Sequence, residues 1–148
     1  MHRFLGRAIN KLDAKGRVSI PANFRDLLIE QGVNGFYCAP SALGANLTGY
    51  GEDFFAEVEA KLRQLNPYSA AYAAQATQAF GDVDRLEFDP EGRVRLPDYL
   101  IAHAGIRDRV QFIGFSSYFE LWNPDTYPAV RAERLALLKR DFGQDGAP

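Results

Sequence analysis

Basic side chains are concentrated at the start of this 148-residue chain. Residues 1–25 contain six cations and one carboxylate, a formal balance of +5, although the whole chain has a net charge of −2. An arginine fork can bond guanine O6 and N7 together, whereas lysines and other arginines mainly neutralise phosphates. This pattern predicts a face that binds a polyanion; on a nucleic acid, Arg17 would suit base edges and Lys15, Arg3, Arg7 and Lys11 would suit phosphates.

A second copy of the segment that carries Arg17 occurs later in the chain. Residues 12–21 and 88–97 share Asp, Gly, Arg, Val and Pro at the same five places, offset by 76 residues. An internal repeat of this kind predicts a structure made of two similar halves. Residues 82–97 have a balance of −2, so the two copies have opposite electrostatic surroundings and only the first is expected to face a polyanion.

Arg17 has a structural alternative, because Asp13 lies four residues before it and could form an ion pair that braces a hairpin. Asp89 and Arg93 repeat the pair in the acidic half. We therefore expect the shared residues to build the turn, while Arg17 either reads bases or braces the hairpin. The expected structural residues are Asp13, Gly16, Asp89, Gly92 and Arg93. Lys15 corresponds to Glu91, and there the copies differ in charge.

The elements that must position these residues follow the same order in both halves. The sequence predicts a strand at 4–10, a turn at 13–16, a second strand and a Pro21-initiated helix that ends at Gly32. Two strands follow near 36–38 and 47–50, and then a helix capped by Asp53 that runs to about residue 65.

The second half repeats this plan with strands at 83–88, 94–96, 110–113 and 118–122. A Pro97-initiated helix ends near Gly105, and a final helix is capped by Asp125 and runs toward Arg140. The predicted organisation is a first repeat at 4–66, a connecting helix at 67–80, a second repeat at 81–140 and a disordered tail at 141–148.

Two Asp-x-x-x-Arg hairpins, each followed by Val-x-Ile/Leu-Pro, together with Phe119-Glu120-Leu121-Trp122, resemble the MraZ family of the SpoVT–AbrB type. The resemblance implies an α+β, pseudo-two-fold, swapped-hairpin β-barrel (AbrB-like) with flanking helices. It also implies a nucleoid-associated repressor of the division and cell-wall gene cluster that includes its own gene. Such proteins bind tandem short G-rich repeats in double-stranded DNA and form homo-oligomeric rings. The family often opens Met-Phe-Arg-Gly, whereas here the order is Phe4-Leu5-Gly6-Arg7.

Other classes of protein have weaker support in the sequence. The two histidines, His2 and His103, and the single Cys38 form no pattern typical of catalysis or metal binding, so we expect no enzyme, cofactor, metal or small-molecule substrate. No apolar run approaches the ~18 residues of a membrane span, and one cysteine favours a reducing, cytoplasmic location. An AbrB-fold protein-interaction module or antitoxin-like autoregulator remains the alternative to a dedicated DNA-binding regulator.

Overall fold

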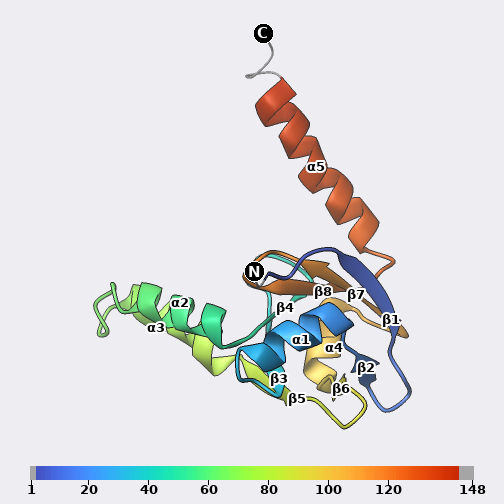
Figure 1. Cartoon of the computed structure of the whole chain (residues 1–148). Coiled ribbons are helices and arrows are strands. Elements are labelled where there is room, and N and C mark those ends of the chain that lie inside the picture. The colour runs from blue at the N-terminus through green and yellow to red at the C-terminus, as the bar shows by residue number, and fades with distance from the viewer. Residues whose placement is uncertain (1–2, 144–148) are drawn as a thin grey trace.

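The computed structural model describes residues 3–143, and its elements follow the two-repeat order of the sequence (Figure 1). The strands are β1 (Arg7–Lys11), β2 (Arg17–Ser19), β3 (Gly35–Pro40), β4 (Leu47–Tyr50), β5 (Asp84–Glu87), β6 (Arg93–Arg95), β7 (Arg109–Gly114) and β8 (Phe119–Trp122). The helices are α1 (Ala22–Glu30), α2 (Glu52–Leu62), α3 (Ala70–Ala76), the π-helical turn η1 (Thr77–Gly81), α4 (Asp98–Ala104) and α5 (Tyr127–Gly143). Within the described part of the chain, no helix has both the length and the apolar character needed to span a bilayer.

The two repeats exchange strands. Six strands form one antiparallel sheet in the order β1-β7-β8-β4-β3-β5, and β2 and β6 form a separate two-stranded ladder. At one edge β1 of the first repeat pairs with β7 of the second, and at the other edge β5 of the second pairs with β3 of the first. The α+β class is therefore confirmed, and neither repeat completes its part of the sheet alone.

The strand register has a pseudo-two-fold axis. Val18 pairs with Val94 in the β2–β6 ladder, and these residues occupy equivalent positions in the two repeats. Thr48 pairs with Glu120 between β4 and β8, again joining equivalent positions. Both pairs lie on the axis that exchanges one repeat for the other, so the duplication visible in the sequence is also a geometric relation between the halves.

The core lies between the sheet, the ladder and the helices α1 and α4. Val18 and Val94 are fully buried in it, and Phe119 packs against Phe4, Phe24 and Phe36 with ring centroids 5.0 to 5.2 Å apart. The predicted strand at 4–10 is shorter because Gly6, with φ +86°, interrupts it. Phe4 is held instead by an isolated bridge to Ser116. The ring contacts of Phe119 add to the stabilisation that burial of these aromatic side chains gives.

The helix starts differ from the prediction at four places. Pro21 and Pro97 have extended backbone angles and immediately precede α1 and α4, instead of forming their first turns. Asp53 does not cap α2, because Gly51 is the N-cap and Asp53 lies in the first turn. Asp125 pairs with Arg109, at 3.0 Å between Oδ1 and Nη2, instead of capping α5.

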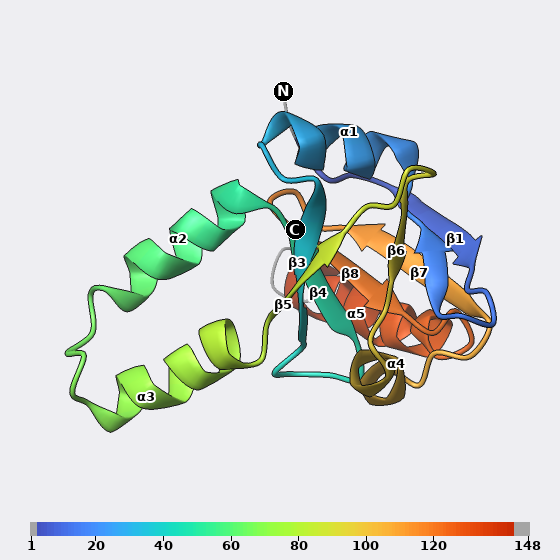
Figure 2. The ribbon, with the colours of Figure 1, turned by 90° about the horizontal axis from the view of Figure 1, so that it is seen from below.

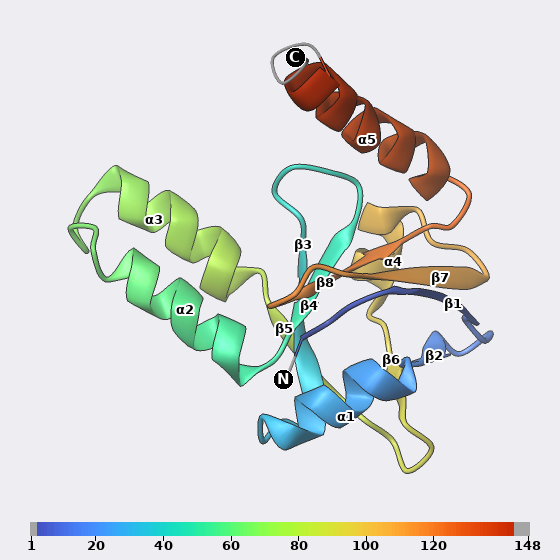
Figure 3. The ribbon, with the colours of Figure 1, turned by 45° about the horizontal axis from the view of Figure 1, so that its top comes forward.

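Two helical segments project from the sheet (Figures 2 and 3). We call α2, α3 and η1 the arm; α3 begins later than the predicted helix at 67–80, after the Ser69 cap, and ends in the π-helical turn. On the opposite repeat α5 starts against the sheet and then extends beyond it (Figure 1). Because α5 reaches Gly143, it includes the first three residues of the predicted tail 141–148, and residues 144–148 lie outside the described residues.

Candidate nucleic-acid interface

The first hairpin turn is organised by one carboxylate. Asp13 Oδ1 accepts hydrogen bonds from the backbone N–H groups of Lys15 at 2.9 Å and Arg17 at 2.8 Å. Asp13 Oδ2 accepts a third bond from Arg17 Nε at 2.7 Å. Gly16 completes the turn with φ +81°, a conformation that glycine adopts without strain. The arginine is therefore braced through Nε, and this bond does not use the two Nη amino groups at its far end.

The second hairpin repeats this geometry. Asp89 Oδ1 accepts from the N–H groups of Glu91 at 2.9 Å and Arg93 at 3.0 Å, and its Oδ2 accepts from Arg93 Nε at 2.8 Å. Gly92 takes φ +76° at the position of Gly16. Since the same bonds form in basic and acidic surroundings, the Asp-Arg brace is a property of the turn itself.

These bonds change the acidity of both aspartates. The backbone N–H of Arg17 stabilises the charged carboxylate and, with its guanidinium, holds the pKa of Asp13 below its usual value. Arg93 acts in the same way to lower the pKa of Asp89. The Asp89 carboxylate in turn raises the pKa of Arg93. Both turns are therefore built for an ionised aspartate.

The two hairpins differ at the tip of the turn. In the second, Glu91 Oε2 lies 3.0 Å from Arg93 Nη2, so that arginine contacts two carboxylates. In the first, Lys15 stands in the place of Glu91. Charge at the tip thus favours binding of an anion at the first hairpin, because a carboxylate already contacts the far end of the arginine in the second.

The β2–β6 ladder brings a residue to the first hairpin that sequence reasoning missed. Arg95 of β6 lies directly opposite Arg17 of β2. Both side chains lie on the outward face, because the neighbouring residues Val18 and Val94 point inward. Leu96 N donates to the carbonyl of Gly16 at 2.8 Å, which fixes this end of the ladder to the first turn. Apolar Val94 and Leu96 alternate with charged Arg95, a pattern that predicts an Arg95 side chain facing solvent. Only the strand register shows that Arg95 lies beside Arg17.

The other predicted phosphate contacts lie along β1. Lys11 is at the hairpin end of this strand, opposite Arg109 of β7, and Arg7 is at the other end, opposite Ile113. Four residues of strand place Arg7 about 13 Å from Lys11. Arg3 precedes β1 and is exposed. The fold thus brings Lys11 toward the Lys15–Arg17 turn and leaves Arg7 and Arg3 farther along the sheet edge.

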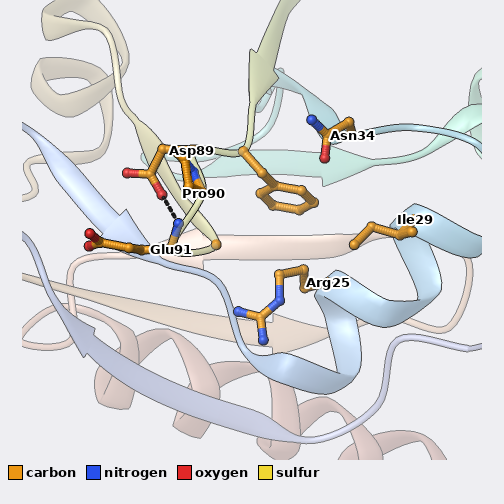
Figure 4. Close-up of a pocket in the computed structure, with 8 residues that line it drawn as sticks. Arg25, Ile29, Asn34, Asp89, Pro90 and Glu91 are labelled. Atoms are coloured by element: carbon orange, nitrogen blue, oxygen red, sulfur yellow. Dashed lines mark hydrogen bonds between the residues drawn. The ribbon is translucent and has the colours of Figure 1, made fainter.

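A pocket of about 540 Å³ lies beside the second hairpin (Figure 4). Arg25 of α1 approaches the turn there, and a Cβ atom on Gly92 would lie 2.4 Å from Arg25 Nη1. At the equivalent place beside the first hairpin, Ile101 of α4 lies near Gly16. The acidic second turn therefore has an internal cation beneath it, whereas the basic first turn rests on an apolar side chain.

The groups considered for catalysis are separate from these turns. His103 Nε2 lies 3.0 Å from the carbonyl oxygen of Gly44, near the end of α4. Burial raises the pKa of the Cys38 thiol, which is inaccessible. Among residues 3–143 no group of three or more His, Cys, Asp or Glu side chains could hold a metal ion, and His2 lies outside the described residues.

A family model and several curated relatives of this chain carry the same family name. A family model described as "MraZ protein, putative antitoxin-like" matches residues 79–141. The "Transcriptional regulator MraZ" of Xanthobacter autotrophicus is 43% identical over 146 residues, covering 97% of this chain and 93% of the relative. This chain belongs to the MraZ family.

Other MraZ proteins agree with that assignment. The "Transcriptional regulator MraZ" of Parvibaculum lavamentivorans is 42% identical over 134 residues, covering 90% of this chain and 83% of the relative. The protein of the same name from Rickettsia bellii is 39% identical over 143 residues, covering 95% of both chains. The MraZ family is one of transcriptional regulators and not of enzymes.

Proposed function

We propose that this protein is a DNA-binding transcriptional regulator whose first hairpin contacts double-stranded DNA. The observation that carries the proposal is the contrast between two turns of the same geometry, one with Lys15 beside its braced arginine and one with Glu91. Arg17, held by Asp13 through Nε, presents its Nη groups to guanine, and Lys15 contacts phosphate. Lys11, Arg7 and Arg3 extend the phosphate contacts along β1.

The target we propose is a set of tandem short G-rich repeats upstream of the division and cell-wall gene cluster that includes the protein's own gene. Binding there represses the cluster, in the cytoplasm and at the nucleoid. Fluorescence anisotropy with upstream DNA and with a scrambled duplex of equal length tests this. We expect tighter binding to the repeats and lower reporter expression when the protein is present. Equal affinity for both duplexes would contradict sequence-specific regulation.

The strand exchange supports a more specific description of the fold. We propose that the six-stranded sheet and the β2–β6 ladder are the single-chain form of a swapped-hairpin, AbrB-like barrel. Its support is the register, in which equivalent residues pair on one axis and each repeat supplies the edge strand of the other. In this arrangement one chain builds what two single-repeat chains build together.

We also propose that several copies of the chain form a ring. The distal part of α5 exposes Leu135, Leu137 and Leu138, with 42 to 52% of each side chain accessible. The sequence of α5 has a balance of +2 and that of α2 has −3. An apolar, basic helix at one side and an acidic arm at the other favour head-to-tail contacts, which close into rings.

Size-exclusion chromatography with light scattering tests the ring. We expect the wild type to be an oligomer and the double variant Leu135→Glu and Leu138→Glu to be smaller, with the same circular dichroism. A wild-type monomer under DNA-binding conditions would contradict the proposal. An oligomer matters for function because several weak hairpins can then bind tandem sites together.

The family model's description, with the word antitoxin, favours one alternative, an AbrB-fold interaction module that regulates its own gene through a protein partner. DNA binding by the purified protein separates the two functions. A dedicated regulator binds the upstream repeats alone, whereas an antitoxin-like autoregulator needs its partner for full affinity.

A further inference from the structure

We infer that Arg95 of the second repeat is a phosphate contact of the first repeat's DNA site. This inference rests on the proposed function, and it changes the composition of the site. DNA is then bound by residues of both repeats, which the strand exchange brings to one end of the ladder.

The position of Arg95 is fixed by contacts with the first hairpin. It pairs with Arg17 across the ladder, and a Cβ atom on Gly16 would lie 3.9 Å from Arg95 Cγ. The aliphatic part of Arg95 therefore lies over the first turn. Its charged end is exposed, and within residues 3–143 it forms no ion pair.

Arg95 enlarges the charge difference between the two ends of the ladder that Lys15 and Glu91 already create. The first end has three cations, Lys15, Arg17 and Arg95, and one carboxylate, Asp13, a balance of +2. The second end has one cation on the turn and its strand, with two carboxylates and an uncharged serine. These four residues are Arg93, Asp89, Glu91 and Ser19, and Arg25 of α1 lies beside this turn. A cation from the acidic repeat thus strengthens the basic end.

Like charges directly opposite one another on neighbouring strands destabilise a sheet. The Arg17–Arg95 pair fits a site where a bound polyanion compensates for this repulsion. The two arginines differ in how they are held, since Asp13 directs Arg17 and no carboxylate of residues 3–143 pairs with Arg95. A braced guanidinium suits the fixed geometry of a base edge, whereas an unbraced one suits a phosphate. We therefore assign Arg95 to the backbone of the DNA.

The test is Arg95→Ser, which installs the side chain that Ser19 has at the equivalent position of the first repeat. The Kd for a duplex with one G-rich repeat and for a random duplex is measured by anisotropy over a range of salt concentrations. Loss of one phosphate contact predicts a Kd about eightfold higher at ~0.1 M salt and about fourfold higher at ~0.2 M. The salt slope, which is the slope of log Kd against log salt concentration, should be smaller by about 1. Both duplexes should be affected equally.

Two variants accompany this one. Arg95→Lys keeps the charge, and we expect it to retain the wild-type salt slope. Arg85→Ser removes an exposed arginine of β5, the strand at the edge of the sheet opposite β1, and we expect no change in Kd. Circular dichroism confirms that each variant is folded.

The outcomes are distinguishable. A folded Arg95→Ser protein with wild-type Kd and salt slope would overturn the role of Arg95 and leave the proposed function intact. A loss confined to the G-rich duplex would contradict a phosphate role. Failure of the wild-type protein to bind either duplex would instead overturn the proposed function.

Discussion

Replacing Lys15 by glutamate would give the first hairpin the tip of the second. The same backbone bonds hold both turns, so the variant is expected to fold. In the second hairpin Glu91 Oε2 is 3.0 Å from Arg93 Nη2. A glutamate at position 15 would reach Arg17 Nη2 in the same way and compete with DNA for that guanidinium.

Two losses of DNA affinity then combine. Removing the Lys15 phosphate contact raises Kd about eightfold at ~0.1 M salt. Engaging Arg17 removes a bidentate guanine contact worth about 1–3 kcal/mol, or about 5- to 150-fold. We therefore expect Lys15→Glu to weaken binding to G-rich DNA about 40- to 1,200-fold.

Anisotropy with a G-rich and a random duplex measures this change. Lys15→Gln is the matched control, because it removes the charge without supplying a carboxylate for Arg17, and only the roughly eightfold loss is expected from it. If folded Lys15→Glu bound G-rich DNA as well as Lys15→Gln does, engagement of Arg17 would be refuted. If both bound like the wild type, Lys15 would not contact DNA.

Three further predictions concern stability. Arg134→Ala removes the guanidinium that lies 2.7 Å from buried Glu120, and urea unfolding should show a loss of about 1–3 kcal/mol. No loss would show that the pair does not stabilise the fold. Because the pKa of Asp89 is lowered in the folded state, its stabilisation is present above about pH 4 and disappears as pH falls through the folded-state pKa. The difference in unfolding free energy between wild type and Asp89→Asn should shrink on acidification, and a constant difference would contradict this. Val18→Ala and Val94→Ala each delete two buried methyl groups on the pseudo-two-fold axis, so each should cost about 2–3 kcal/mol, and clearly unequal losses would contradict equivalent packing.

Local chemistry made the two turns predictable from the sequence. The bonds from Asp13 span only four residues, and the Asp, Gly and Arg that form them recur at fixed spacing in the second turn. The ion pair expected between Asp13 and Arg17 is present. Helix starts were less certain, because Asp53 and Gly51 are both good N-cap residues and the side-chain pattern did not distinguish between them.

The pairing of strands needed information beyond the local pattern. β1 and β5 are equivalent short strands, and nothing in their own sequences says that each pairs with the other repeat. The role of Arg95 depends on this exchange. Read along the chain, Arg95 belongs to an acidic segment, and only the β2–β6 register places it beside Arg17. The DNA-contacting roles of these residues stay predictions.

The comparison of Arg17→Ala with Arg93→Ala tests the central claim most directly. Each variant loses an equivalent brace to an aspartate, at 2.7 and 2.8 Å, and Arg93→Ala also loses the contact with Glu91 at 3.0 Å. Binding of each folded variant to the upstream G-rich repeats is measured beside the wild type. We expect Arg17→Ala to lose specific binding and Arg93→Ala to keep most of it. Equal losses in two folded variants would contradict a DNA site centred on the first hairpin.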